Sequence, residues 1–289
     1  MLEEVLDLPH GVPGKDAFRR VLGLLEPAAF QASFASWRNA LRIAASAETA
    51  IEQPIFAVDG KTLRRSHDKK NGLGALHSVS IWAREFGLSL GRVACAEKSN
   101  EITAIPEVLK LVDIAGAIVT IDAMGTQKAI AAQIANREAD YVLALKGNRE
   151  TLHDAVVEYV DMPSANDFAD IAVRRHATTE SAHGRDTTRC YFPMPVPIDL
   201  ADLELWKGLQ TIGVAISACV RDGKATVETR YSISSLPVGV KRFARAVRGH
   251  CRANAHKYAC FYSVSRVLSM VLTRNCSDNV RFRLKNRTI

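Results

Sequence analysis

The sequence predicts an α/β protein with a mixed β-sheet, flanking helices, a β-rich insertion and a small helical region at the N-terminus. Through the middle of the chain, apolar runs of strand length alternate with helical periodicity, and this alternation follows an antiparallel meander. Elements in that order form a mixed sheet with helices on its faces. A strand-rich block follows, and the apolar fraction of 47% suits a folded domain.

The N-terminal region is predicted to be helical over about residues 16–43. Apolar residues recur with helical spacing until Pro27 interrupts the pattern. A second stripe then carries Phe30, Phe34, Trp37 and Leu41 at intervals of one turn. The periodicity changes at Pro54, so we expect residues 1–50 to form a separate helical region and residues 51–250 to form the core.

The core is expected to begin with three strands and to continue with alternating helices and strands. The meander strands are predicted at residues 55–58, 77–83 and 88–96. Helices are then predicted at residues 103–112, 126–137 and 150–160, and further strands at 117–121 and 141–145.

The β-rich insertion is expected at about residues 165–235. Its strands are predicted at residues 168–174, 188–192, 209–220 and 225–234. The sequence RDGK at residues 221–224 is typical of a hairpin turn between the last two.

The basic residues are unevenly distributed. The chain of 289 residues has a formal charge of +7. Residues 241–289 contain 12 Lys or Arg and a single acidic residue, Asp278, so the first 240 residues carry a net charge of −4. A protein that coats DNA through a uniformly basic surface is therefore excluded, whereas a near-neutral body with a basic terminal segment is compatible with the pattern.

The sequence favours a cytoplasmic protein without a membrane span. No apolar run approaches the roughly 18 residues that a transmembrane helix needs, and an acidic start follows Met1. The six cysteines include no CxxC pair, so we expect reduced thiols and no zinc site.

Two aspartates stand where apolar strand-like runs end. Asp59 follows IFAV at residues 55–58, and Asp122 follows AIVTI at residues 117–121. Carboxylates at the ends of neighbouring strands can share divalent cations, and paired metals serve phosphoryl displacement. An aspartate after a strand is also a common turn former or helix N-cap, and spacing alone leaves both interpretations open.

Five stretches resemble the signature motifs of the H-repeat-associated insertion-sequence transposases of the DDE type. They occur in the family's order, and the resemblance extends from about His10 to about His250. The stretches are AVDGKTLR at residues 57–64, EKSNEITAIP at 97–106, VTIDAMGTQ at 119–127, DYVLALKGN at 140–148 and HGR at 183–185.

The resemblance implies a ribonuclease-H-like core, with a β-rich insertion before the final catalytic helix. Asp59 and Asp122 would be the first two members of an Asp-Asp-Glu triad that holds two Mg²⁺ or Mn²⁺ ions. The implied reaction is cleavage of DNA and transfer of the released 3′-hydroxyl to target DNA. The implied partners are the element ends and target DNA, with self-association on DNA in the nucleoid.

Several polar residues are candidates for DNA contacts, each with a structural alternative. Basic residues that follow Asp59 could grip phosphates or form a solvated loop. The KGN and HGR motifs could touch DNA or form turns, and the RGH motif at residues 248–250 lies near the expected catalytic helix. The candidates are Lys61, Arg64, Arg65, Lys146, Asn148, Arg185, Arg248 and His250. For residues 97–101, capping of a helix that begins near Thr103 is the first interpretation.

The third carboxylate of the triad is missing. Asn254 stands where the family has its Glu, and no Glu occurs after Glu228. A neutral amide oxygen cannot supply the charge of a carboxylate. Residues 251–289 resemble no family segment, and we hypothesise a frameshift near residue 251 that impairs catalysis. The alternative ligands are Asp278 and Glu228.

Three functions are therefore compatible with the sequence. The first is a DDE transposase with impaired catalysis in this copy. The second is a non-catalytic DNA-binding or dominant-negative fragment. The third is a structure-selective nuclease on the same fold, which would cut without element ends.

Overall fold

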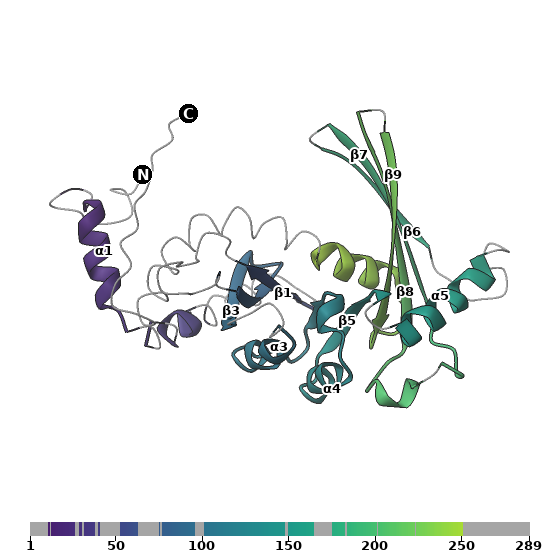
Figure 1. Cartoon of the computed structure of the whole chain (residues 1–289), viewed down its shortest axis with the longest axis horizontal. Helices are drawn as coiled ribbons and strands as arrows, with labels where there is room; N and C mark the ends of the chain where they lie inside the picture. The colour runs from purple at the N-terminus through teal and green to yellow at the C-terminus, as the bar shows by residue number, and fades with distance from the viewer. Residues whose placement is uncertain are drawn as a thin grey trace. The chain divides into compact units, whose positions relative to one another are not determined.

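The computed structural model (Figure 1) divides into two compact units, residues 1–44 with 255–289 and residues 45–254. The structure describes residues 11, 13–26, 29–30, 32–37, 40, 53–62, 75, 77–95, 101–147, 150–164, 175–182, 184–200, 202–222 and 224–250. The predicted strand at residues 168–174 lies outside the described residues. No helix among the described segments is long and apolar enough to cross a membrane.

One nine-stranded sheet organises the larger unit, in the order β3-β2-β1-β4-β5-β9-β8-β7-β6. The parallel pairs are β1–β4 and β4–β5, and the remaining neighbours are antiparallel. The strands are β1 (Ile55–Thr62), β2 (His77–Ala83), β3 (Leu88–Cys95), β4 (Ile118–Ile121), β5 (Asp140–Leu145), β6 (His176–Ala182), β7 (Arg185–Pro195), β8 (Thr211–Arg221) and β9 (Lys224–Ser234).

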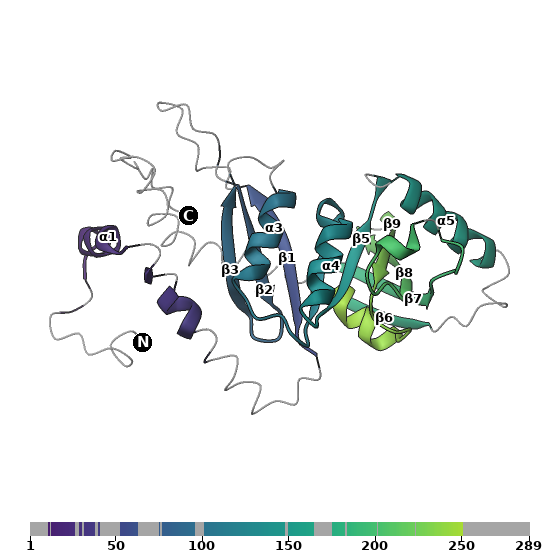
Figure 2. The same ribbon diagram turned by 90° about the horizontal axis from the view of Figure 1, so that it is seen from below.

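Helices cover the two faces of this sheet unequally. On one face, apolar residues of α3 (Glu101–Lys110), α4 (Lys128–Asn136) and α5 (Glu150–Ser164) join the main core. Figure 2 shows α3 and α4 beside the strands of the first half of the sheet. A helix over residues 240–250 lies on the other face, where Phe243 packs with Ile55, Ile118 and Tyr191. The described residues of this unit also include the short 3₁₀ helices η2 (Ala123–Gly125) and η4 (Leu203–Leu205).

This architecture confirms the predicted ribonuclease-H-like mixed sheet. A meander of three antiparallel strands precedes two strands that run parallel to the first, with crossover helices between them. The β-rich insertion follows α5 and precedes the helix at residues 240–250. It is not a separate layer, because β9 pairs with β5 and so extends the same sheet.

The described N-terminal residues include the predicted helices. The first, α1 (Lys15–Leu24), ends before Pro27. In the second, the ring centroids of Phe30 and Phe34 lie 6.1 Å apart, and those of Phe34 and Trp37 lie 5.3 Å apart. The aromatic stripe therefore lies on one helical face, as the spacing predicts.

Three local predictions were wrong. β1 does not end at Val58, because β2 continues to pair with it as far as Thr62. The helix expected from Thr103 begins at Glu101. β6 was not predicted at all, since its polar sequence HATTESA lacks an apolar run and only pairing with β7 makes it a strand.

Replacement of Gly213 by Ala tests the packing of the helix at residues 240–250. A Cβ atom at this position would lie 2.1 Å from Cζ of Phe243, whose ring is buried. We expect a loss of about 1–3 kcal/mol in unfolding free energy and a fall of roughly 2–12 °C in Tm. Gly147→Ala is the control, because no atom lies within 4 Å of its added Cβ. Equal Tm values for the two variants, by circular dichroism, would contradict this packing.

Candidate active site

The register of β1 and β4 brings Asp59 and Asp122 to neighbouring positions. The last paired residues of these parallel strands are Val58 and Ile121, and each aspartate comes next in its chain. Neighbouring strands lie about 4.8 Å apart, and side chains at matched positions point to the same face. Both aspartates are half-buried. The structure therefore places the two predicted carboxylates side by side.

The aspartates share the face on which the helix at residues 240–250 lies. Side chains alternate along a strand, and Val58 and Ile121 belong to the core beneath α3 and α4. The residues that follow them project from the opposite face. That face is the one on which Ile55 and Ile118 contact the helix at residues 240–250.

The path of this helix leads to the two aspartates. Near its start, Phe243 packs against Gly213 of β8. Near its end, Gly249 lies so close to β1 that an added Cβ would be 3.1 Å from Cγ2 of Ile55 and 2.8 Å from Cδ of Arg84. The helix thus crosses β9, β5 and β4, and its last described turn lies over the strands that carry the carboxylates.

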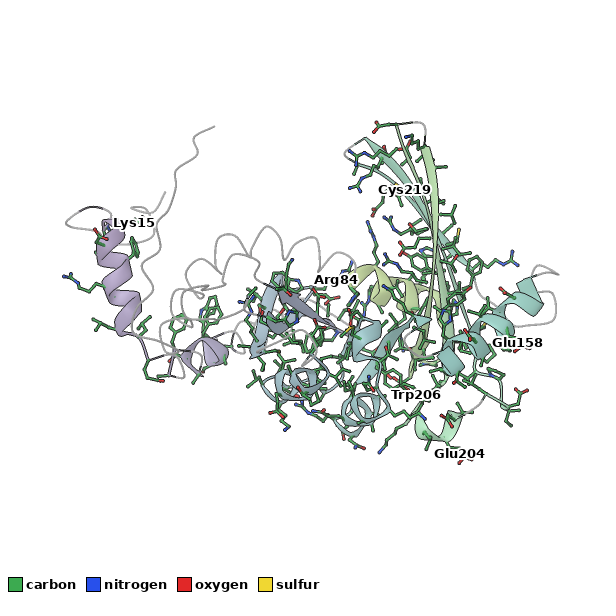
Figure 3. All side chains as sticks on the ribbon, viewed as in Figure 1. Lys15, Arg84, Glu158, Glu204, Trp206 and Cys219 are labelled. Carbon is green, nitrogen blue, oxygen red and sulfur yellow. The ribbon has the colours of Figure 1, made fainter. Side chains whose placement is uncertain are left out.

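His250 links the helix to the site. Its Nδ1 lies 3.1 Å from the hydroxyl oxygen of Thr120, which is two residues before Asp122 and therefore on the same face. The predicted DNA-binding residue His250 thus contacts β4 two residues before Asp122. Figure 3 labels Arg84, which marks the point where this helix meets β1.

The geometry does not support a capping role for either aspartate. Asp122 precedes η2, but its side chain makes no capping hydrogen bond there, and the N-cap of α4 is Gln127. Asp59 lies inside β1, where it pairs with Ser80 of β2, so it forms no turn. Register therefore places both carboxylates at a face of the sheet.

Cationic side chains from neighbouring positions share the face of the aspartates. Lys61 lies two residues beyond Asp59 on β1, and strand alternation places it on the same face. The row from Asp59 continues through Ser80 to Arg92 of β3. Burial lowers the pKa of Arg92 to about 10, so it stays charged at neutral pH. Sequence analysis missed Arg92, because the register of β2 and β3 is needed to find it.

The remaining predicted DNA-binding residues are not all in one place. Lys146 is exposed directly after β5, and Arg185 is exposed at the start of β7. Arg64, Arg65, Asn148 and Asn254 lie outside the described residues.

Arg248 contacts the insertion through Glu180 of β6. Its guanidinium forms an ion pair with Oε2 of Glu180, and Nη1 of Arg189 on β7 lies 3.3 Å from the same oxygen. All three side chains are partly exposed, with between 20% and 37% of their surface accessible. The shared carboxylate therefore connects the helix at residues 240–250 to the first strands of the insertion.

Glu228 is poorly placed to replace the missing carboxylate. Ser232 of β9 pairs with Ala144 of β5, which is at the level of Asp122. Glu228 lies four residues before Ser232 on β9, which displaces it by about 13 Å along the strand. Hydrogen bonds from Arg230, 2.9 Å long, lower the pKa of Glu228. Asp278, the other alternative ligand, lies outside the described residues.

A buried polar group lies behind β1, on the face opposite to Asp59. Nε2 of His77 lies 2.5 Å from Oε1 of Glu101, and both side chains are at most 5% exposed. Nδ1 of His77 lies 2.7 Å from the hydroxyl oxygen of Thr62. A Cβ on Gly60 would lie 2.3 Å from the Glu101 carboxylate, so only glycine fits beside it. The Glu101 side chain is thus buried against His77, and residues 97–100, the remainder of the predicted capping segment, lie outside the described residues.

Two carboxylates alone do not complete a metal site. Within the described part of the chain, no group of three or more His, Cys, Asp or Glu side chains could hold an ion. Asp59 and Asp122 supply hard oxygen ligands of the kind that Mg²⁺ prefers, and they fit a divalent ion as a partial ligand set. The third ligand would have to approach from the side on which the helix at residues 240–250 ends.

The chain is similar to known proteins over most of its length. Residues 51–192 match the family model described as Transposase DDE domain. The Escherichia coli O157:H7 protein named Putative transposase YncI is 39% identical over 253 residues, which cover 86% of this chain and 63% of that protein. H repeat-associated putative transposase YbfD of Escherichia coli K12 is 36% identical over 70% of this chain and 76% of its own length.

A further relative and a solved structure extend the comparison. H repeat-associated putative transposase YhhI of Escherichia coli K12 is 37% identical over 86% of this chain and 65% of its own length. The chain thus spans 63% and 65% of the lengths of YncI and YhhI. A piggyBac transposase synaptic complex with hairpin DNA is similar over 71% of this chain and 40% of that chain, with 8% identity and a TM-score of 0.36.

Replacement of Glu101 by Gln tests the buried pair behind β1. We expect a loss of about 1–3 kcal/mol in unfolding free energy, because the substitution weakens a buried polar contact of 2.5 Å while His77 stays buried. Glu107→Gln on the same helix is the matched control, since Glu107 pairs with Lys110 in solvent and should contribute less than about 1 kcal/mol. Urea unfolding, completed as a double-mutant cycle with His77→Gln, measures the coupling. A coupling energy near zero would refute the pairing.

Proposed function

The chain belongs to the H-repeat-associated transposases of the DDE type, and from this premise we propose that it binds DNA and carries an incomplete strand-cleavage and strand-transfer site at Asp59 and Asp122. The observation that supports this proposal is the parallel register of β1 and β4, which sets the two carboxylates side by side. The face that bears them also receives the end of the helix at residues 240–250.

Membership in this family implies dependence on a divalent metal. In the proposed site, Asp59 and Asp122 would hold Mg²⁺ or Mn²⁺, with two ions in a complete site. Bound metal would activate an oxygen nucleophile and neutralise charge on the phosphodiester. The protein's own residues would orient the DNA: Lys61 and Arg92 share the face of the carboxylates and suit phosphate contacts.

The family resemblance gives the position of the missing acid. Asn254 stands where the family has its Glu, four residues after His250 in the sequence. We propose that catalysis in this copy is impaired because an amide stands at this position. We further propose that residues 251–289 form an atypical basic segment created by a frameshift. Translation of the other reading frames at the locus tests this origin.

The alternative proposal is a non-catalytic DNA-binding or dominant-negative fragment. The amide of Asn254, at the position where the family has its Glu, favours it. Such a fragment would occupy element ends, or associate with intact transposase in the cytoplasm and nucleoid, without cutting DNA. Salt-sensitive binding to an end-containing duplex, with no cleavage in Mg²⁺, is the result that would select this function over the enzyme.

Restoration of the third acid tests the proposed site. Asn254→Glu should raise Mg²⁺-dependent or Mn²⁺-dependent cleavage of an end-containing duplex by roughly 100-fold or more, because a carboxylate supplies charge that an amide lacks. It should also tighten Mn²⁺ binding, measured by calorimetry without DNA. Asn254→Gln is the matched control, because Gln is isosteric with Glu but carries no charge, and it should change neither cleavage nor Mn²⁺ binding.

The gain must depend on the two aspartates. Combination of Asn254→Glu with Asp59→Asn or Asp122→Asn should return cleavage and Mn²⁺ binding to the level of the unmodified chain. Persistence of the gain in either combination would place the metal elsewhere and would refute the proposed site.

A further inference from the structure

The outer part of the insertion forms a four-stranded arm, which we define as residues 176–182, 185–190, 216–221 and 224–230. Its strands are paired without interruption. At the turn end, Arg185 pairs with Arg221, and Arg221 pairs with Lys224. In Figure 1 this end projects away from α3, α4 and α5. Cys219, labelled in Figure 3, lies in the arm on β8, two residues before Arg221.

Strand alternation places every Lys and Arg of the arm on one face. One face of the arm carries Arg185, Thr187 and Arg189 of β7, together with the residues of the other strands that pair with them. We call this the basic face. Its charged residues are Arg185, Arg189, Arg221, Lys224 and Arg230, with Glu180 and Glu228. The other face carries Asp186 and small, apolar or hydroxyl residues, and it has no Lys or Arg.

Side-chain contacts agree with this division. Arg189 binds Glu180 and Arg230 binds Glu228 on the basic face, and Thr187 bonds to Cys219 on that face. On the other face, the hydroxyl oxygens of Thr179 and Thr188 lie 3.3 Å apart. The separation of charge therefore holds for side chains as well as for backbone register.

Three cations stand in one row at the turn end. Arg185 of β7 is matched with Arg221 of β8, which is matched with Lys224 of β9. All three are exposed, and the single acid at this end that pairs with them in the described residues is Asp222, 3.5 Å from Arg221. Like charges directly opposite each other destabilise a β-sheet. The row thus works against folding stability and suits a polyanion as partner.

The basic face is on the same side of the sheet as the two aspartates. Tyr191 and Ala215 continue the basic face towards the core and pack against the helix at residues 240–250. Arg248 of that helix binds Glu180. On β9, Ser232 lies two residues after Arg230 on the same face, and it pairs with Ala144 of β5. Ala144 follows Leu143, the partner of Ile121, and so lies at the level of Asp122. One side of the sheet therefore carries both features.

We propose that the basic face of the arm binds the phosphate backbone of duplex DNA that flanks the site at Asp59 and Asp122. This inference rests on the proposed function and names where the flanking duplex lies. The six residue-to-residue steps from Ala215 to Arg221 span about 20 Å, which matches about six base pairs at 3.4 Å each. Exposed arginine and lysine contact phosphates without reading sequence, so this surface holds and orients the duplex.

The test removes the charge at the turn end and measures salt-dependent binding. Arg221→Gln with Lys224→Gln is compared with Lys110→Gln combined with Lys128→Gln, an equal loss of charge on α3 and α4, whose apolar sides pack on the opposite face of the sheet. Binding of a fluorescent DNA duplex is followed by anisotropy between about 50 and 200 mM salt. The slope of log affinity against log salt concentration is negative, and its magnitude should decrease by about 2 in the arm variant and stay unchanged in the control.

Folding is checked by Tm, which should be equal or higher in the arm variant because repulsion within the row is reduced. A wild-type slope in an arm variant that is folded would overturn the arm proposal and leave the proposed function standing. An equal fall in the control variant would also overturn it, since the effect would then follow net charge. Absence of DNA binding by the unmodified chain would overturn both proposals.

Discussion

The parallel pairing of β1 with β4 is the constraint on which the rest of the structure depends. It matches Val58 with Ile121 and so sets Asp59 beside Asp122. A slip of one residue would turn every side chain of a strand to the other face, which would bury an aspartate beneath α3 and α4 and expose an apolar residue. The core residues Phe56, Val58 and Val119, all fully buried, therefore fix the register that positions the carboxylates.

The helix at residues 240–250 depends on the same sheet but arrives from far along the chain. The insertion separates it from α5, yet β9 returns the chain to β5 and so delivers the helix to the aspartate face. Gly249 permits close contact with β1, and Phe243 fills the space above Gly213. The insertion is thus a structural connection to the site as well as an added surface.

Sequence patterns predicted the strands that consist of a continuous apolar run. They failed where pairing with a neighbouring strand determines whether, or how far, a strand forms. β2, β4 and β5 were predicted within a residue or two, because buried strands read as continuous apolar runs. β6 is polar and exists through its partner, and β1 extends through Asp59 because β2 pairs with it. The ends of apolar runs predicted both aspartates as candidate site residues, but the positions of Arg92, Glu180 and Glu101 require strand register or tertiary contacts to be recognised.

Net charge was a poor guide to the surface that suits DNA. The first 240 residues carry −4, yet all five cations of the arm lie on one face and none on the other. The described basic residues after residue 240 include two that serve internal contacts: Arg245 donates to the carbonyl oxygen of Gln53, and Arg248 binds Glu180. Strand alternation sorts charges by direction, which a sum over the sequence cannot do. A nearly neutral body can therefore present a basic face beside its carboxylates.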